Sequence, residues 1–355
     1  MNDHNPGELL LDASVPNTQV SLAVKESSQV AEARQRVTSL ARGIGFNETD
    51  TGRVALAVTE LATNLVKYAT NGALVSRVVP QFEGCGIEVL ALDTGPGMAN
   101  VTECLRDGYS TTGSPGTGLG AVLRLSSLSE IYSAPGKGTA MLTHFQPQGA
   151  RTRRSLAVRR LPATLGTVCL PHVGETVCGD AWAIDQRAGR VRVMVADGLG
   201  HGPLAMEAAQ EAVSVFRAHP TLAPAALLEV MHTALRRTRG AAVAVAEIDL
   251  TAQLVHFAGV GNIAGTVLVP AGRHGLTSLN GIVGYTISKI QTFTYPWADK
   301  ALLVMHSDGL QSRWDFDTYP GLTLRHPSLI AGVLYRQYTR GRDDVTVIAV
   351  KTQRS

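Results

Sequence analysis

The chain has 355 residues, which is enough for about two domains. Charged residues make up 17% and the formal net charge is +3, so neither nucleic acid nor a membrane surface is expected as a partner. No apolar run approaches the ~18 residues of a membrane span, and the polar, acidic N-terminus does not resemble a signal peptide. The four cysteines have no CxxC spacing. We therefore expect a cytoplasmic protein with reduced thiols and no zinc site.

Two helices are predicted near the N-terminus. Apolar residues recur with helical spacing over 27–42, and Gly43 follows as a stop. Apolar residues surround most of a second helix over 52–70, which predicts that it is buried. Glu60 and Asn64 lie one turn apart on one face of this helix. Because buried polar groups need partners, the pair either bonds to neighbouring backbone or lines a ligand pocket, with Asn64 facing a hard cation and Glu60 acting as a base.

Strands are predicted next, over residues 72–79 and 86–92. The second strand ends in Asp93, and Gly95 and Gly97 allow the backbone to turn tightly. A loop rich in Gly, Ser and Thr then leads into a helix, "DGYSTTGSPGTGLGAVLRLSS". Such a loop supplies free backbone N–H groups and a positive helix N-terminus, and both suit a phosphate.

The motifs of this first half resemble, in their order, the GHKL (Bergerat) nucleotide-binding fold and, within it, the RsbT-like serine kinases of the anti-sigma class. The stretches "ELATNLVKYA", "LDTGPGM", "DGYSTTGSPGTGLGAVLRL" and "PGKGTAM" carry the resemblance over residues 16–146. It implies an α/β sandwich that binds ATP with Mg²⁺. Asn64 would coordinate the magnesium, Glu60 would be the catalytic base, and Asp93 would bind the adenine amino group. The other implied nucleotide contacts are Gly95, Gly97, Thr117, Gly118, Leu119, Gly120 and Thr139.

The two halves are joined by a predicted linker over residues 147–160. It contains five arginines within ten residues, which suits a solvated linker or contact with an acidic partner. Because it is short, the two domains are expected to stay close together.

Aspartates mark the strand ends of the second half, which is predicted as one domain over residues 161–351. Asp180 precedes a strand and Asp197 ends the next, while Asp308 ends a third and Asp343 and Asp344 precede a fourth. Converging carboxylates repel one another unless cations neutralise them. Oxygen-only ligands suit Mg²⁺ or Mn²⁺.

A dinucleotide-binding loop is the alternative interpretation of "VADGLGHGP". It is excluded because the GxGxxG pattern requires glycine where the chain has Pro203. We therefore predict a metal site, in which Gly198 is glycine so that its carbonyl can approach a ligand sphere.

The second half resembles the RsbX-like, SpoIIE-type branch of the metal-dependent (PPM) Ser/Thr protein phosphatases. The stretches "VCGDAW", "VADGLGHGPLA", "FAGVGN", "HSDGL" and "YTRGRDDVTVI" occur in the order of that family. The resemblance implies an αββα sandwich with two Mn²⁺ or Mg²⁺ ions. Asp197 would be the catalytic bridging ligand, the Gly198 carbonyl would bind one ion, and Asp180, Asp308 and Asp343 would complete the pair.

The overall prediction is an α+β chain with two opposing activities on one phosphorylation switch. The first domain would phosphorylate a STAS-domain antagonist or stressosome protein, and the second would remove the phosphate. A sigma factor or a downstream phosphatase is a further possible partner. Two alternatives stay open: a first domain that only binds nucleotide and a partner, and a stand-alone hydrolase with an inert fused domain. Glu60 favours the kinase, because a binding module needs no carboxylate there.

Overall fold

The computed structural model describes residues 19–81, 84–104, 118–147 and 161–352. Their packing divides the chain into two compact units. One unit holds the described residues up to 147 together with Asp315–Gln337, and the other holds 161–314 and 338–352. A segment from late in the chain thus belongs to the same unit as the first domain.

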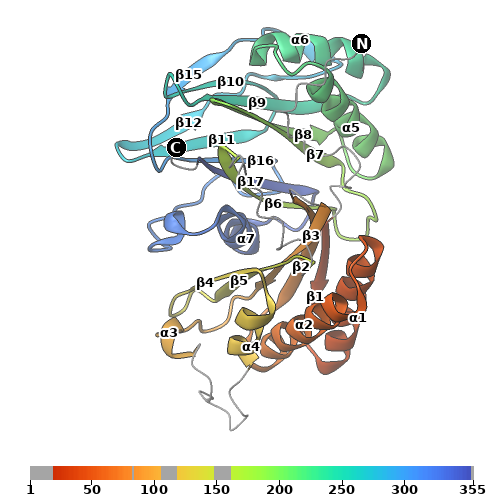
Figure 1. Ribbon diagram of the computed structural model, residues 1–355. Helices are drawn as coiled ribbons and strands as arrows, with labels where there is room; N and C mark the ends of the chain where they lie inside the picture. Colours follow the sequence, from red (N-terminus) through yellow and green to blue (C-terminus); the bar gives the residue numbers. More distant parts are fainter. Residues whose placement is uncertain (1–18, 82–83, 105–117, 148–160, 353–355) are drawn as a thin grey trace, which may run out of the picture. The chain divides into compact units, whose positions relative to one another are not determined.

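The N-terminal unit is built on one antiparallel sheet in the order β1-β2-β3-β5-β4 (Figure 1). Its strands are β1 Gln19–Ala23, β2 Ala73–Gln81, β3 Gly84–Leu92, β4 Leu128–Ser133 and β5 Thr139–Phe145. Its helices are α1 Ser27–Gly43, α2 Glu48–Tyr68, α3 Val101–Cys104, α4 Gly118–Leu125 and, from the late segment, α7 Pro327–Tyr338. The two strands predicted before Asp93 are therefore confirmed, with slightly longer bounds.

Helix α2 begins at Glu48, four residues before the predicted start. The Asn47 side chain caps it by accepting a hydrogen bond from the Asp50 backbone N–H at 2.8 Å. Acidic residues in the first turn also suit the positive end of the helix dipole. The polar stretch "NETD", which precedes the predicted helix, is therefore its cap and first turn.

The central strand β3 is buried on both faces of its sheet. Ile87, Val89 and Ala91 belong to the core formed with α1 and α2. Because side chains alternate across a strand, Glu88, Leu90 and Leu92 point to the opposite face. That face is covered by α7, where a side chain at Gly332 would come within 3.1 Å of Leu92.

The C-terminal unit contains two five-stranded antiparallel sheets in the orders β15-β10-β9-β8-β7 and β12-β11-β16-β17-β6. The first sheet contains β7 Asp180–Arg187, β8 Arg190–Gly198, β9 Ala241–Asp249, β10 Leu254–Val260 and β15 Phe293–Pro296. The second contains β6 Ala163–Leu170, β11 Ala264–Val269, β12 Gly272–Leu276, β16 Leu302–His306 and β17 Val345–Thr352. A small hairpin, β13 Gly281–Ile282 with β14 Thr286–Ile287, forms a separate two-stranded sheet.

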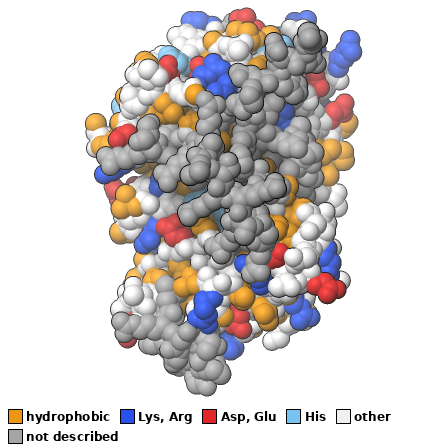
Figure 2. Space-filling view, in the orientation of Figure 1, with side chains coloured by type: hydrophobic (Ala, Val, Ile, Leu, Met, Phe, Trp, Pro, Cys, Tyr) orange, Lys and Arg blue, Asp and Glu red, His pale blue; other side chains and the backbone are white. Residues whose placement is uncertain are grey.

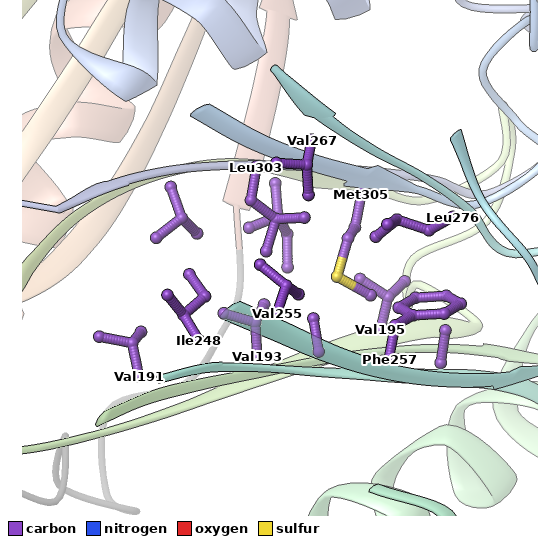
Figure 3. Packing of buried hydrophobic residues seen from close by; sticks show 14 of the residues in the cluster. Val191, Val193, Val195, Ile248, Val255, Phe257, Val267, Leu276, Leu303 and Met305 are labelled. Atoms are coloured by element: carbon purple, nitrogen blue, oxygen red, sulfur yellow. The ribbon is translucent and has the colours of Figure 1, made fainter. Parts of the chain in front are cut away.

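Side chains from the two sheets of this unit interdigitate in one apolar core (Figure 3). Val193 and Val195 of β8 meet Leu303 and Met305 of β16 in this cluster. The other face of the first sheet packs on α5 Pro203–Ala218 and α6 Pro224–Ala234. Pro203 lies in the first turn of α5, and burial on both faces of the sheet explains the apolar run 193–196 of β8.

Charges are well mixed on the surface that Figure 2 shows. Lys and Arg side chains and Asp and Glu side chains are scattered among hydrophobic and other side chains over the described part of this view. No helix of the described residues is long and apolar enough to cross a membrane.

Candidate functional site

The first candidate site lies where α2 meets the start of α4. Gly118 opens α4, and a Cβ at this position would lie 2.7 Å from Glu60 Oε2 and 4.0 Å from Asn64 Nδ2. The two polar side chains of α2 therefore face the N-terminus of α4 at Gly118, which has no side chain of its own. Such a terminus favours a negatively charged ligand.

Asp93 follows β3 and is 8% exposed. Its Oδ1 accepts a hydrogen bond from the Gly95 N–H at 2.7 Å, and its own N–H donates to the Thr139 carbonyl at 2.9 Å. Burial raises the pKa of the Asp93 carboxyl, while the Gly95 N–H and the nearby Arg336 oppose that rise. The carboxylate is thus held in place at the end of the strand, where it could accept a hydrogen bond from a ligand.

Two glycines close this site because only glycine fits there. Gly97 and Gly138 both have positive φ, at 71° and 70°. A Cβ on Gly97 would collide with the Ala134 backbone, and one on Gly138 with the Asp93 backbone. The turn after β3 and the turn before β5 are therefore packed directly on each other.

The second candidate site is built around Asp180 and Asp197, which are directly opposite each other in the β7–β8 ladder. Ser307 donates a hydrogen bond from Oγ to Asp180 Oδ2 at 2.6 Å. The other oxygen, Asp180 Oδ1, is buried without a hydrogen-bond partner among the described residues. A buried carboxylate oxygen without a partner is costly in water-free surroundings, and a cation would satisfy it.

Three more aspartates interact electrostatically with one or both members of this pair. Asp308 follows β16, and its Oδ2 accepts a hydrogen bond from Asn262 Nδ2 at 2.8 Å. Asp343 and Asp344 precede β17, and Asp344 is buried with Oδ1 accepting from the His172 N–H at 2.8 Å. The strand ends that carry the predicted aspartates thus come together at one end of the two sheets.

The electrostatics of this cluster favour bound cations. Burial, with added repulsion from Asp344 and Asp343, raises the pKa of Asp180 to about 7. Burial and the charges of Asp180, Asp308 and Asp343 raise the pKa of Asp197 to about 9. Within the described ranges, no three Asp, Glu, His or Cys side chains are grouped so that they could hold a metal ion as they stand. Oxygen-only donors and mutual repulsion fit Mg²⁺ or Mn²⁺, which Asp180, Asp197, Asp308, Asp343 and the Gly198 carbonyl would hold.

Packing against α5 gives a structural reason for glycine at position 198. A Cβ at this position would collide with the Ala205 backbone at the start of α5. The Gly198 N–H also donates to the Gly179 carbonyl at 3.1 Å. The glycine therefore lets β8 end close against α5, and a role for its carbonyl as a metal ligand stays a prediction.

The first half of the chain matches a known domain and a known kinase. Residues 23–143 match the family described as "Histidine kinase-like ATPase domain". Serine/threonine-protein kinase RsbT of Bacillus subtilis (strain 168) is 32% identical over 123 residues, covering 35% of this chain and 92% of the relative. The chain belongs to the RsbT family. Its RsbT-like domain confirms the predicted GHKL fold.

The second half matches a phosphatase family. Residues 187–353 match "Stage II sporulation protein E (SpoIIE)". Phosphoserine phosphatase RsbX of Bacillus subtilis (strain 168) is 24% identical over 138 residues, covering 39% of this chain and 69% of the relative. A solved structure described as "The bacterial stressosome: a modular system that has been adapted to control secondary messenger signaling" is similar at 28% identity. That match has a TM-score of 0.51 and covers 53% of this chain and 99% of the other.

The chain therefore fuses an RsbT-like domain with a SpoIIE domain, as predicted. In the RsbT-like domain, Glu60, Asn64 and Gly118 come together, followed on α4 by Leu119 and by Gly120, which is buried. Asp93, Gly95, Gly97 and Thr139 gather at the adjoining strand ends. Thr117 lies outside the described residues.

Two supporting residues of the SpoIIE domain were missed by the sequence analysis. Ser307 is next to Asp308 in the sequence, and its hydroxyl donates a hydrogen bond to Asp180. Asn262, between β10 and β11, donates a hydrogen bond to Asp308. Both hydrogen bonds join residues that are far apart in the sequence. The sequence could therefore show only that each residue lies close to the end of a strand.

Proposed function

We propose that this chain both adds and removes a phosphoryl group on a serine or threonine of one cytoplasmic partner protein. The observation that carries the proposal is the presence of two separate sites in one chain. One is the pair Glu60 and Asn64 facing the start of α4, and the other is the aspartate pair of β7 and β8.

The SpoIIE domain supports the phosphatase activity. Asp180, Asp197, Asp308 and Asp343 would hold divalent cations, and these would supply an activated water for phosphate hydrolysis. The chain's own residues supply the oxygen ligands, and Ser307 and Asn262 fix the orientation of Asp180 and Asp308. Supporting hydrogen bonds of this kind commonly tune metal affinity.

The RsbT-like domain supports the kinase activity. Asn64 would hold the magnesium that accompanies ATP, and Asp93 would accept a hydrogen bond from the adenine amino group. Glu60 would take the proton from the attacking hydroxyl, because its carboxylate lies at the α4 terminus where the phosphates would sit. A general base at this place is what separates phosphate transfer from nucleotide binding alone.

The proposed partner is a STAS-domain protein of a partner-switching or stressosome system, with a sigma factor or a downstream phosphatase as a further partner. The test uses a purified STAS-domain protein phosphorylated on serine. The full chain with Mn²⁺ should release phosphate from it, and a chelator should stop the release. If no phosphoserine protein loses phosphate with either Mn²⁺ or Mg²⁺, the phosphatase assignment is wrong.

A further inference from the structure

Arg336 of α7 reaches the backbone of the candidate nucleotide site. Its Nη1 donates to the Thr139 carbonyl at 2.9 Å, and its Nη2 donates to the Lys137 carbonyl at 2.7 Å. Arg336 is separated from both residues by almost 200 positions in the sequence. The planar guanidinium can bind two acceptors at once, which fixes their relative position.

The Thr139 carbonyl connects this arginine to the adenine aspartate. It accepts hydrogen bonds both from Arg336 Nη1 and from the Asp93 backbone N–H, each at 2.9 Å. Arg336 also attracts the Asp93 carboxylate, which it favours in the ionised form. A shift of Arg336 would therefore move the turn before β5 and, with it, the strand end that carries Asp93.

The segment 315–337 is anchored so that the arginine stays in place. Ser328, near the start of α7, donates from Oγ to the buried Glu88 carboxylate at 2.6 Å. Gly332 lies against Leu92, the residue before Asp93. Near the start of the segment, the Tyr319 ring contacts Lys137, whose Nζ lies 5.5 Å from the ring centroid.

We propose that Arg336 is a positioning residue of the adenine pocket. It holds the Lys137–Thr139 turn against Asp93, so a helix from the late part of the chain completes the nucleotide site of the RsbT-like domain. The inference rests on the proposed function, because it requires that Asp93 binds an adenine nucleotide.

The test measures nucleotide binding to the full chain by calorimetry in Mg²⁺, with ATP and GTP as the two probes. Arg336→Met keeps the length of the side chain and removes both hydrogen bonds. Its ATP affinity should fall about tenfold, the size expected for lost charged hydrogen bonds. The ratio of its ATP affinity to its GTP affinity should also decrease. Arg336→Lys keeps the charge and should lie between wild type and Arg336→Met.

Arg325→Met is the matched control. Arg325 lies on the same segment and pairs with Glu130 of β4 at 3.5 Å, away from the Asp93 turn. It should leave both affinities unchanged. An equal loss in Arg325→Met and Arg336→Met would show that docking of the segment matters and not the arginine, and would overturn the inference.

A double-mutant cycle of ATP affinities distinguishes a role through Asp93 from a purely structural role of Arg336. If Arg336 acts through Asp93, Arg336→Met should cost little further ATP affinity once Asp93→Asn is present. Additive losses would contradict the inference, as would equal ATP binding by wild type and Arg336→Met. A wild-type chain that binds no ATP would instead overturn the proposed nucleotide site, and the inference with it.

Discussion

Asp180 and Asp197 are directly opposite each other in the β7–β8 ladder, and the charge of Asp180 adds to burial in raising the pKa of Asp197. Such a pair is stable without cations only if protons are taken up, because two buried carboxylates repel each other. The arrangement therefore serves cation binding at the cost of stability in the cation-free protein.

Asp197→Asn should abolish the Mn²⁺-dependent release of phosphate from a phosphoserine protein. The change removes the charge expected to bridge two cations but keeps the size of the side chain. In the cation-free chain the variant should be at least as stable as wild type, because the repulsion with Asp180 is gone. Thermal unfolding without and with Mn²⁺ checks this, and near-normal phosphatase activity in the variant would refute the metal assignment.

Asn262→Ala should lower the metal affinity of the phosphatase site and leave the fold intact. Asn262 orients Asp308 through the 2.8 Å hydrogen bond to Oδ2. Loss of a supporting bond of this kind commonly lowers metal affinity by about 10- to 100-fold. A titration of phosphatase activity against Mn²⁺ should therefore move to higher concentration, with activity recovered at saturation. An unchanged titration would show that Asn262 does not act on the metal site.

Gly198→Ala should disturb the end of β8, because the added Cβ would collide with the Ala205 backbone. Overpacking of this kind costs about 1–3 kcal/mol, and it would shift the loop next to Asp197. Phosphatase activity and the free energy of unfolding in urea should both fall. Gly275→Ala is the control in the same unit, because a Cβ there meets nothing within 4 Å; an equal loss in both variants would argue against this explanation.

The placement of the aspartates was predictable from the sequence, whereas their supporting bonds were not. Each aspartate stands where an apolar strand begins or ends, and such boundaries follow from local pattern. The bonds from Ser307 to Asp180 and from Asn262 to Asp308 depend on how distant strands meet. The same holds for α7, since an apolar helix between β16 and β17 gives no sign that it would cover the sheet of the first domain.

Glu88→Gln should change how the stability of the chain depends on pH. Burial opposes ionisation of Glu88, but Arg77 at 2.6 Å and His144 at 2.8 Å outweigh it and hold the pKa well below its usual range. A depressed carboxyl pKa stabilises the fold above the unfolded-state pKa, and this stabilisation is lost as the pH falls below it.

At pH 7 the variant should be less stable by about 3 kcal/mol, the usual cost of removing one partner of a buried ion pair. Between pH 5 and pH 3, about one unit either side of the ordinary Glu pKa, its stability should fall less steeply than that of wild type. Circular dichroism during thermal unfolding across this range measures both effects. Glu32→Gln breaks an exposed pair with Arg36 and should change little; equal behaviour of the two variants would contradict the assigned role of Glu88.

Glu60→Gln tests the central claim, that one chain carries both opposing activities. The measurement is phosphate transfer from Mg-ATP to a STAS-domain protein, made in the Asp197→Asn background so that the phosphorylated product is not hydrolysed by the phosphatase site. ATP binding should persist through Asn64 and Asp93, while transfer should fall by about 10²–10⁴-fold, the usual contribution of a general base. If the Asp197→Asn chain with Glu60 intact binds ATP yet phosphorylates no such protein, the RsbT-like domain is a nucleotide-dependent docking module and the claim is wrong.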